Sequence, residues 1–151
     1  MNKDTKILVV EDSDFQREIC IHQLKELGFD NLSSATNGLE AFNILTTSPI
    51  DLIISDWEMP EMDGIELLEK TKKDPSLKKI PFLILTVHED EEANKKVLEM
   101  GAIDYIVKPS SPEVLLEKLG YILKGMRKES DRRQLERRES ARRKPENERR
   151  E

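Results

Sequence analysis

The stretch "IISDWEMPEMDG", residues 53–64, places a carboxylate directly after an apolar run. Leu52–Ile54 suits a strand that is covered on both faces, yet Asp56 follows almost at once. Three more acidic residues come before Gly64. Because an unpaired charge is costly to bury, this crowding of negative charge at the end of a strand requires a compensating cation.

Continuous apolar runs of the same kind occur at other points along the chain, and each is short enough for a buried strand of a parallel sheet. The four runs are Ile7–Val10, Leu52–Ile54, Phe82–Leu85 and Tyr105–Val107. Leu32–Ala35 is a weaker candidate that suits the edge of a sheet.

Helical periodicity lies between the runs. The first pattern has an expected inner face made of Phe15, Ile19, Cys20, Leu24 and Leu27. The others cover about residues 39–45, 65–74, 93–100 and 112–126. Strands that alternate with helices five times predict an α/β fold with a doubly wound, five-stranded parallel sheet.

Ligand sites in such sheets lie beyond the carboxyl ends of the strands. The predicted strands lead into Glu11, Asp12, Asp56, Thr86 and Lys108. Three carboxylates that meet at one edge repel one another, and a hard cation such as Mg²⁺ relieves that repulsion. Together with the lysine and the hydroxyl, the site would suit a phosphoryl group, with a carboxylate as a nucleophile.

These elements together resemble the receiver domain of bacterial two-component response regulators, of the chemotaxis-regulator type. The resemblance covers about residues 5–126 and rests on motifs in the family's order: Glu11-Asp12 after "ILVV", Asp56 after "LIIS", "MPEMDG", Thr86 after "LIL" and Lys108-Pro109 after "YIV". It implies the flavodoxin-like strand order 2-1-3-4-5. It also implies a switch that catalyses only its own phosphorylation and dephosphorylation, and is otherwise not an enzyme.

The resemblance assigns the acceptor and the metal ligands. Asp56 would receive a phosphoryl group from a sensor histidine kinase or a histidine phosphotransfer protein. Mg²⁺, for which Mn²⁺ could substitute, would be held by Glu11, Asp12, Asp56 and the backbone carbonyl of Glu58.

The resemblance also assigns the switch. Lys108 would pair with the phosphoryl group, Thr86 would turn inward to it, and Tyr105 would move with that hydroxyl. The surface of the fourth helix, fifth strand and fifth helix would change as a result. Pro60 and Gly64 would shape the loop after the acceptor, and the bond before Pro109 would be cis.

Three positions are candidates for tuning the reaction rates. Val87 stands where the family usually has a small residue, so it could narrow access to the acyl phosphate. Glu58 and His88 each lie two positions after a site residue, where a charged pair could screen or position the attacking water.

Two other functions compete with the phosphorylated switch. A degenerate receiver would act as a scaffold that needs no phosphorylation, and Val87 keeps that reading open. A phosphohydrolase that forms an aspartyl phosphate would also use Asp56 and Mg²⁺, with Glu58 as its general acid or base. The Lys108-Pro109 motif and the lack of a cap domain argue against the hydrolase.

Charge divides the chain at about residue 126. Residues 127–151 contain eleven basic and seven acidic residues, a net charge of +4, which leaves −10 for residues 1–126 of the total of −6. We therefore expect a receiver over residues 1–126 and a charged, basic helical extension or linker over 127–151. Pro145 discourages further helix, so the end is expected to be disordered.

The extension has three candidate uses: a plain charged extension or linker to an output domain, a helix that pairs with another copy or a partner, or a contact with nucleic acid or another anionic surface. Its interspersed acids and lack of aromatic residues argue against nucleic acid. A homodimer could form through this helix or through the switch surface. With no apolar run near the roughly 20 residues of a membrane helix, we expect a cytoplasmic protein.

Overall fold

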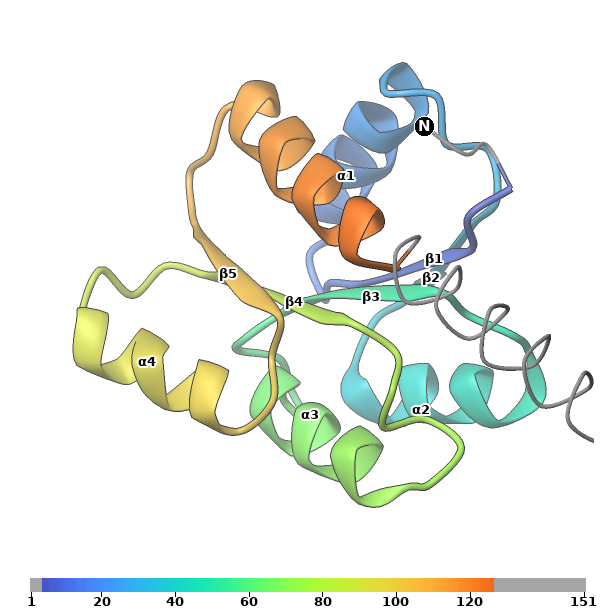
Figure 1. Cartoon of the computed structure of the whole chain (residues 1–151), viewed down its shortest axis with the longest axis vertical. Helices are drawn as coiled ribbons and strands as arrows, with labels where there is room; N and C mark the ends of the chain where they lie inside the picture. Colours follow the sequence, from blue (N-terminus) through green and yellow to red (C-terminus); the bar gives the residue numbers. More distant parts are fainter. Residues whose placement is uncertain (1–3, 127–151) are drawn as a thin grey trace, which may run out of the picture. The chain divides into compact units, whose positions relative to one another are not determined.

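The computed structural model describes residues 4–126, which contain one five-stranded parallel sheet (Figure 1). The strands are β1 (Ile7–Val10), β2 (Leu32–Ala35), β3 (Leu52–Asp56), β4 (Phe82–Thr86) and β5 (Asp104–Val107). Their order is β2-β1-β3-β4-β5, with β2 at one edge. The predicted fold class and the flavodoxin-like order are therefore confirmed.

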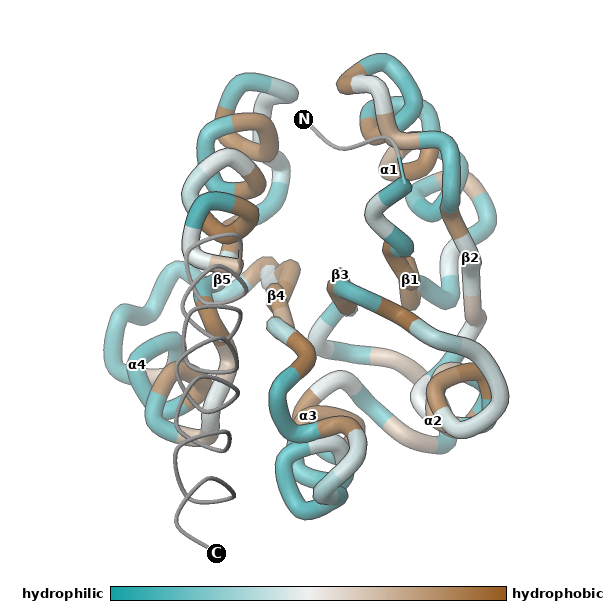
Figure 2. The backbone as a smooth tube through the Cα atoms, turned by 45° about the vertical axis from the view of Figure 1, so that its right-hand side comes forward, coloured by the Kyte–Doolittle hydropathy of each residue, from teal (hydrophilic) through white to brown (hydrophobic). Residues whose placement is uncertain are grey.

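The strands form because their apolar runs are covered on both faces. All four residues of β1 are fully buried, as are the first four of β3. The edge strand β2 is less buried, and only Ala35 is inaccessible. In Figure 2 the central strands contain hydrophobic stretches, whereas the helix α4 (Glu91–Glu99) is largely hydrophilic.

Helices cover both faces of the sheet. α1 (Asp14–Glu26) lies on one face, and α2 (Gly38–Thr47), α3 (Gly64–Lys73) and α4 lie on the other (Figure 1). Each of these four helices begins with a side chain that accepts a hydrogen bond from its first turn, and the capping residues are Ser13, Asn37, Asp63 and Asp90. Their sequences thus fix where they start.

The predicted inner face of α1 is partly wrong. Phe15 and Ile19 are 72% and 42% exposed, whereas Cys20 and Leu24 are buried. Residues four apart share one face of a helix, but Phe15 precedes Cys20 by five residues and is rotated about 140° away from it. The buried stripe therefore passes through Cys20 and Leu24, whereas Phe15 and Ile19 remain exposed.

The chain divides into two compact units, Met1–Lys118 and Leu119–Glu151. The sheet belongs to the first. A fifth helix covers residues 112–126 and begins after Ser111, as the sequence predicts. The predicted basic extension over residues 127–151 lies outside the described residues. Within residues 4–126, no helix has the length and hydrophobicity needed to cross a bilayer.

Candidate functional site

Residues from four strands meet at the carboxyl edge of the sheet. Glu11 and Asp12 follow β1, Asp56 ends β3, Thr86 ends β4, and Lys108 follows β5. The parallel register sets Asp56 beside Leu85 and Thr86 beside Val107, which brings the ends of neighbouring strands level. The structure therefore places the predicted acidic, hydroxyl and lysine side chains at one edge.

The three carboxylates lie close enough to share an ion. Glu11, Asp12 and Asp56 each offer an oxygen, and these oxygens lie within 4.8 Å of one another. Glu11 is buried, the Asp56 side chain is 14% exposed, and Asp12 is open to solvent. One end of the cluster is thus buried in the protein, and the other is open to solvent.

Burial is the largest influence on the pKa of the Glu11 carboxyl group. The loss of hydration raises the pKa of its carboxyl group, and the nearby charge of Asp56 raises it further. A hydrogen bond from Lys108 opposes this rise, and the backbone N–H of Ser13 donates to Oε1 at 3.2 Å. The hydrogen bonds from Lys108 and Ser13 therefore do not fully offset the effect of burial and of Asp56 on the Glu11 carboxyl group.

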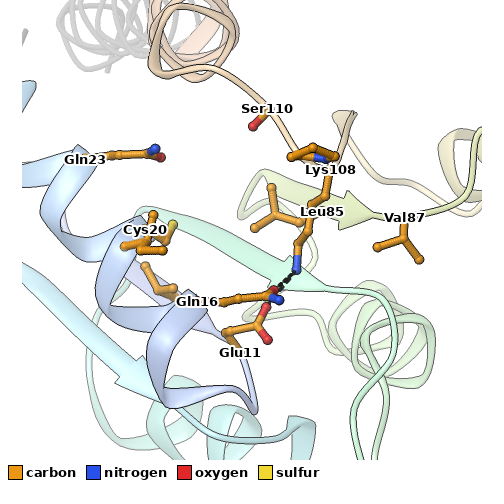
Figure 3. Close-up of a pocket in the computed structure, with 11 residues that line it drawn as sticks. Glu11, Gln16, Cys20, Gln23, Leu85, Val87, Lys108 and Ser110 are labelled. Atoms are coloured by element: carbon orange, nitrogen blue, oxygen red, sulfur yellow. Dashed lines mark hydrogen bonds and ion pairs between the residues drawn. The ribbon is translucent and has the colours of Figure 1, made fainter.

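The Lys108 ammonium group is the cation of this cluster. Its Nζ lies 3.0 Å from Glu11 Oε2 and donates to Gln16 Oε1 at 2.8 Å (Figure 3). It also lies 3.2 Å from Asp56 Oδ1. The Lys108-Pro109 peptide bond is cis, as the resemblance implied. Lys108 is thereby held by hydrogen bonds to Glu11 and Gln16 and by an ion pair with Asp56, which come from the β1–α1 loop, α1 and β3.

The loop after β3 approaches the backbone of Asp56 closely. The N–H of Gly64 donates to Trp57 O at 2.8 Å, and the N–H of Trp57 donates to Asp56 Oδ1 at 2.9 Å. A Cβ at position 64 would lie 2.1 Å from Asp56 O. Glycine is therefore required there for steric reasons, while exposed Pro60 lies in the same loop.

The predicted rate-tuning residues border Asp56. His88 Nε2 lies 2.9 Å from Glu58 Oε1, and its ring meets Trp57 edge-on with centroids 4.9 Å apart. Together with Val87, which is 60% exposed, these residues line the pocket that contains Asp56. A contact between the β3–α3 and β4–α4 loops thus spans one side of the site.

Comparison with known proteins gives the family. The family model for the response regulator receiver domain matches residues 7–120. This chain belongs to the response regulator receiver family. The receiver is similar to chemotaxis protein CheY-3 of Vibrio cholerae, with 38% identity over 122 residues that cover 81% of this chain and 94% of that protein.

Other relatives agree. Chemotaxis protein CheY1 of Helicobacter pylori is 38% identical over 119 residues, which cover 78% of this chain and 96% of that protein. Among solved structures, the signal receiver domain of a signal transduction histidine kinase from Syntrophus aciditrophicus is 41% identical, with a TM-score of 0.73. It matches over 80% of this chain and 91% of its own. The chain is thus a CheY-like receiver, and such domains are signalling modules.

Thr86 and Tyr105, the predicted switch residues of the receiver, occupy different environments. Thr86 is fully buried, and its hydroxyl accepts a hydrogen bond from the N–H of His88 at 2.9 Å. Tyr105 is half-buried and packs against the core between the sheet and the helices α2 to α4. The hydroxyl of Thr86 is therefore already committed to the β4–α4 loop.

Sequence reasoning missed two residues of α1 that contact the site. Gln16 accepts from Lys108, and Arg17 donates through Nη1 to the carbonyl of Glu11 at 2.8 Å. Gln16 lies 92 positions before Lys108 in the sequence, so no local pattern reveals their contact. The one available signal is that Gln16 lies in the first turn of the helix that directly follows Glu11 and Asp12, and so near the same edge of the sheet.

Arg17 stabilises the loop between β1 and α1, which contains Glu11 and Asp12. Its guanidinium also pairs with Asp14, and its side chain is 16% exposed. Replacing Arg17 with methionine leaves the Glu11 carbonyl and the Asp14 carboxylate without this donor. We expect it to lower the free energy of unfolding by about 2 kcal/mol, measured by urea denaturation. Lys25→Met, which removes an exposed charge from the same helix, is the control; an equal loss in both variants would contradict the bracing role.

A second cavity adjoins the pocket that contains Asp56. Its volume is about 380 Å³, and it shares Glu11, Gln16, Val87 and Lys108 with the acidic pocket (Figure 3). Cys20 forms part of its wall, and burial raises the pKa of that thiol to about 11. A thiol that stays protonated at neutral pH is a weak nucleophile, so Cys20 serves as a packing residue.

Proposed function

We propose that this receiver accepts a phosphoryl group on Asp56, from a histidine kinase or a histidine phosphotransfer protein, in a reaction that depends on Mg²⁺. One observation carries the proposal. Three carboxylate oxygens lie within 4.8 Å of one another, and the Lys108 ammonium lies 3.2 Å from Asp56. That combination supplies a nucleophile together with positive charge for phosphoryl oxygens.

The residues present fit a hard divalent cation. Three carboxyl groups cluster beside a single ammonium, and the possible ligand atoms of that cluster are all carboxylate oxygens. Glu11, Asp12, Asp56 and the backbone carbonyl of Glu58 would hold Mg²⁺, and Mn²⁺ could replace it. When bound, the ion supplies positive charge that offsets the charge of the phosphoryl oxygens.

The chain's own groups carry out the transfer. A carboxylate oxygen of Asp56 attacks the phosphorus atom of the donor's phosphohistidine and forms a P–O bond. The P–N bond breaks, and the imidazole leaves with its electron pair. Lys108 moves from the free carboxylate to the new phosphoryl oxygens, and the Thr86 hydroxyl donates a hydrogen bond to one of them.

The signal then leaves the site through the switch. Thr86 is buried beside the β4–α4 loop, and Tyr105 lies on the neighbouring strand β5. Phosphorylation shifts a balance between two conformations of α4, β5 and the fifth helix. A partner protein, a second copy of the chain or an output domain then recognises the changed surface.

Intact mass tests the proposal directly. Incubation with Mg²⁺ and acetyl phosphate is expected to add one phosphoryl group to the wild-type protein, and Asp56→Asn is expected to add none. Removal of Mg²⁺ with a chelator should also abolish the adduct. Asp30→Asn, an exposed acid away from the site, should behave as the wild type does.

Other outcomes would favour the competing functions. If the wild type acquires no phosphoryl group under any of these conditions, the protein acts as a scaffold. If it instead turns over a phosphomonoester continuously, it is a phosphohydrolase. Light scattering on the same samples measures solution mass, and an increase that accompanies the adduct would assign the output to self-association.

A further inference from the structure

The β4–α4 loop is connected to the acceptor site through one backbone N–H. The N–H of His88 donates to the hydroxyl of Thr86 at 2.9 Å, and Thr86 is fully buried. The proposed function requires this hydroxyl to turn toward the phosphoryl group. The turn takes away the acceptor of the His88 N–H, and a backbone donor in a part-buried position then needs a new partner.

Asn94 of α4 has a buried acceptor without a hydrogen-bond partner. Its side-chain Nδ2 donates to the carbonyl of His88 at 3.0 Å, and the residue is only 1% exposed. Among the buried side-chain polar atoms of residues 4–126, its Oδ1 is the one without a hydrogen-bond partner. Buried acceptors are nearly always satisfied in native proteins, so this atom requires an explanation.

These two groups belong to the same small region. The oxygen and nitrogen of the Asn94 amide share one carbon, and the nitrogen already contacts residue 88. The unsatisfied oxygen therefore lies close to the residue whose N–H is released when Thr86 turns. Before Thr86 turns, the Asn94 oxygen has no donor. After it turns, the His88 N–H would have no acceptor unless it bonded to that oxygen.

We propose that Asn94 is a positioning residue that takes over the His88 N–H when Thr86 turns to the phosphoryl group. This inference rests on the proposed phosphorylation of Asp56. In the free protein the Asn94 amide is bound only through its nitrogen, and in the phosphorylated protein its oxygen accepts from the His88 backbone. The exchange draws the loop toward α4 and so links the acceptor site to that helix.

The same movement reaches the mouth of the site. The His88 side chain pairs with Glu58 at 2.9 Å and packs against Trp57. A shift of the backbone at residue 88 therefore moves the ring that contacts Trp57. The indole fluorescence thus reports the same exchange that brings the loop to α4.

Amide hydrogen exchange at His88, followed by NMR, tests the proposal in the full chain. The probe is Mg²⁺ with beryllofluoride, a phosphoryl analogue, and bound fluoride signals show that the adduct has formed. In the wild type, the His88 N–H is expected to be protected both before and after the adduct forms. If its protection is lost in the wild-type adduct, no new acceptor exists and the proposal is overturned.

Variants of Asn94 identify the acceptor. In the adduct of Asn94→Ala, the His88 amide is expected to exchange about tenfold faster than in the wild-type adduct, because one hydrogen bond is missing. Asn94→Asp keeps a side-chain oxygen as a possible acceptor, so retained protection of the His88 amide in its adduct would support an oxygen acceptor at position 94. Asn43→Ala, an exposed residue on α2, is the matched control.

The outcomes separate this inference from the proposed function. Equal protection of the His88 amide in the wild-type and Asn94→Ala adducts would overturn the role of Asn94 while leaving phosphorylation of Asp56 intact. Failure of the wild type to bind beryllofluoride at all would instead overturn the proposed function, and the exchange along with it.

Discussion

Replacing Lys108 with methionine is expected to change metal binding and phosphotransfer in opposite directions. The ammonium lies 3.0 Å from Glu11 and 3.2 Å from Asp56, where it repels a divalent cation. Its removal should tighten Mg²⁺ binding on the order of tenfold, because this repulsion amounts to about 1–2 kcal/mol in water-like surroundings. Phosphotransfer should slow by roughly 10²- to 10³-fold, because the group that neutralises the transferred phosphoryl oxygens is lost.

Two measurements on the same protein check this prediction. A Mg²⁺ titration followed by Trp57 fluorescence gives the metal affinity, and the rate of adduct formation with acetyl phosphate at saturating Mg²⁺ gives the transfer. Lys95→Met removes an exposed charge from α4 and should change neither quantity. If Lys108→Met weakened Mg²⁺ binding, the ammonium would be organising the carboxylates rather than competing with the ion.

The second large effect is expected from Gly64→Ala. The new Cβ would lie 2.1 Å from the carbonyl oxygen of Asp56 and 3.1 Å from Trp57 Cα, and both are backbone atoms. The loop and the end of β3 must therefore separate, which stretches the 2.8 Å hydrogen bond from the Gly64 N–H to Trp57 O. We expect a loss of about 3 kcal/mol in the free energy of unfolding.

Urea denaturation followed by Trp57 fluorescence measures that loss. Gly120→Ala is the control, since position 120 is helical and a Cβ there meets nothing within 4 Å. The control should gain up to about 1 kcal/mol, because alanine favours a helix over glycine. An unchanged stability in Gly64→Ala would show that the loop relaxes without cost and that glycine is not required for packing.

Local pattern was sufficient for most of the fold. The apolar runs predicted all five strands, and the helices begin and end at caps and glycines that are visible in the sequence. Strand ends were less certain, because β3 and β4 include the polar residues Asp56 and Thr86. Backbone pairing with the neighbouring strand extends them past the last apolar residue, and hydrophobic pattern does not record that pairing.

The sequence likewise predicts some features of the site and not others. The sequence by itself determined which chemical groups follow the strands, because a parallel sheet brings the carboxyl ends of its strands to one edge. It did not determine which face of α1 is buried, since stripes through Phe15 or through Cys20 both have apolar residues at helical spacing.

Only the tertiary structure decided the contacts that connect those groups. Lys108 meets Glu11 across 97 positions, Glu58 meets His88 across 30, and Asn94 contacts a carbonyl on the loop before its own helix. Each contact depends on how two elements pack and on which rotamer a polar side chain adopts. Periodicity and spacing constrain single elements, whereas these hydrogen bonds exist only once the elements are assembled.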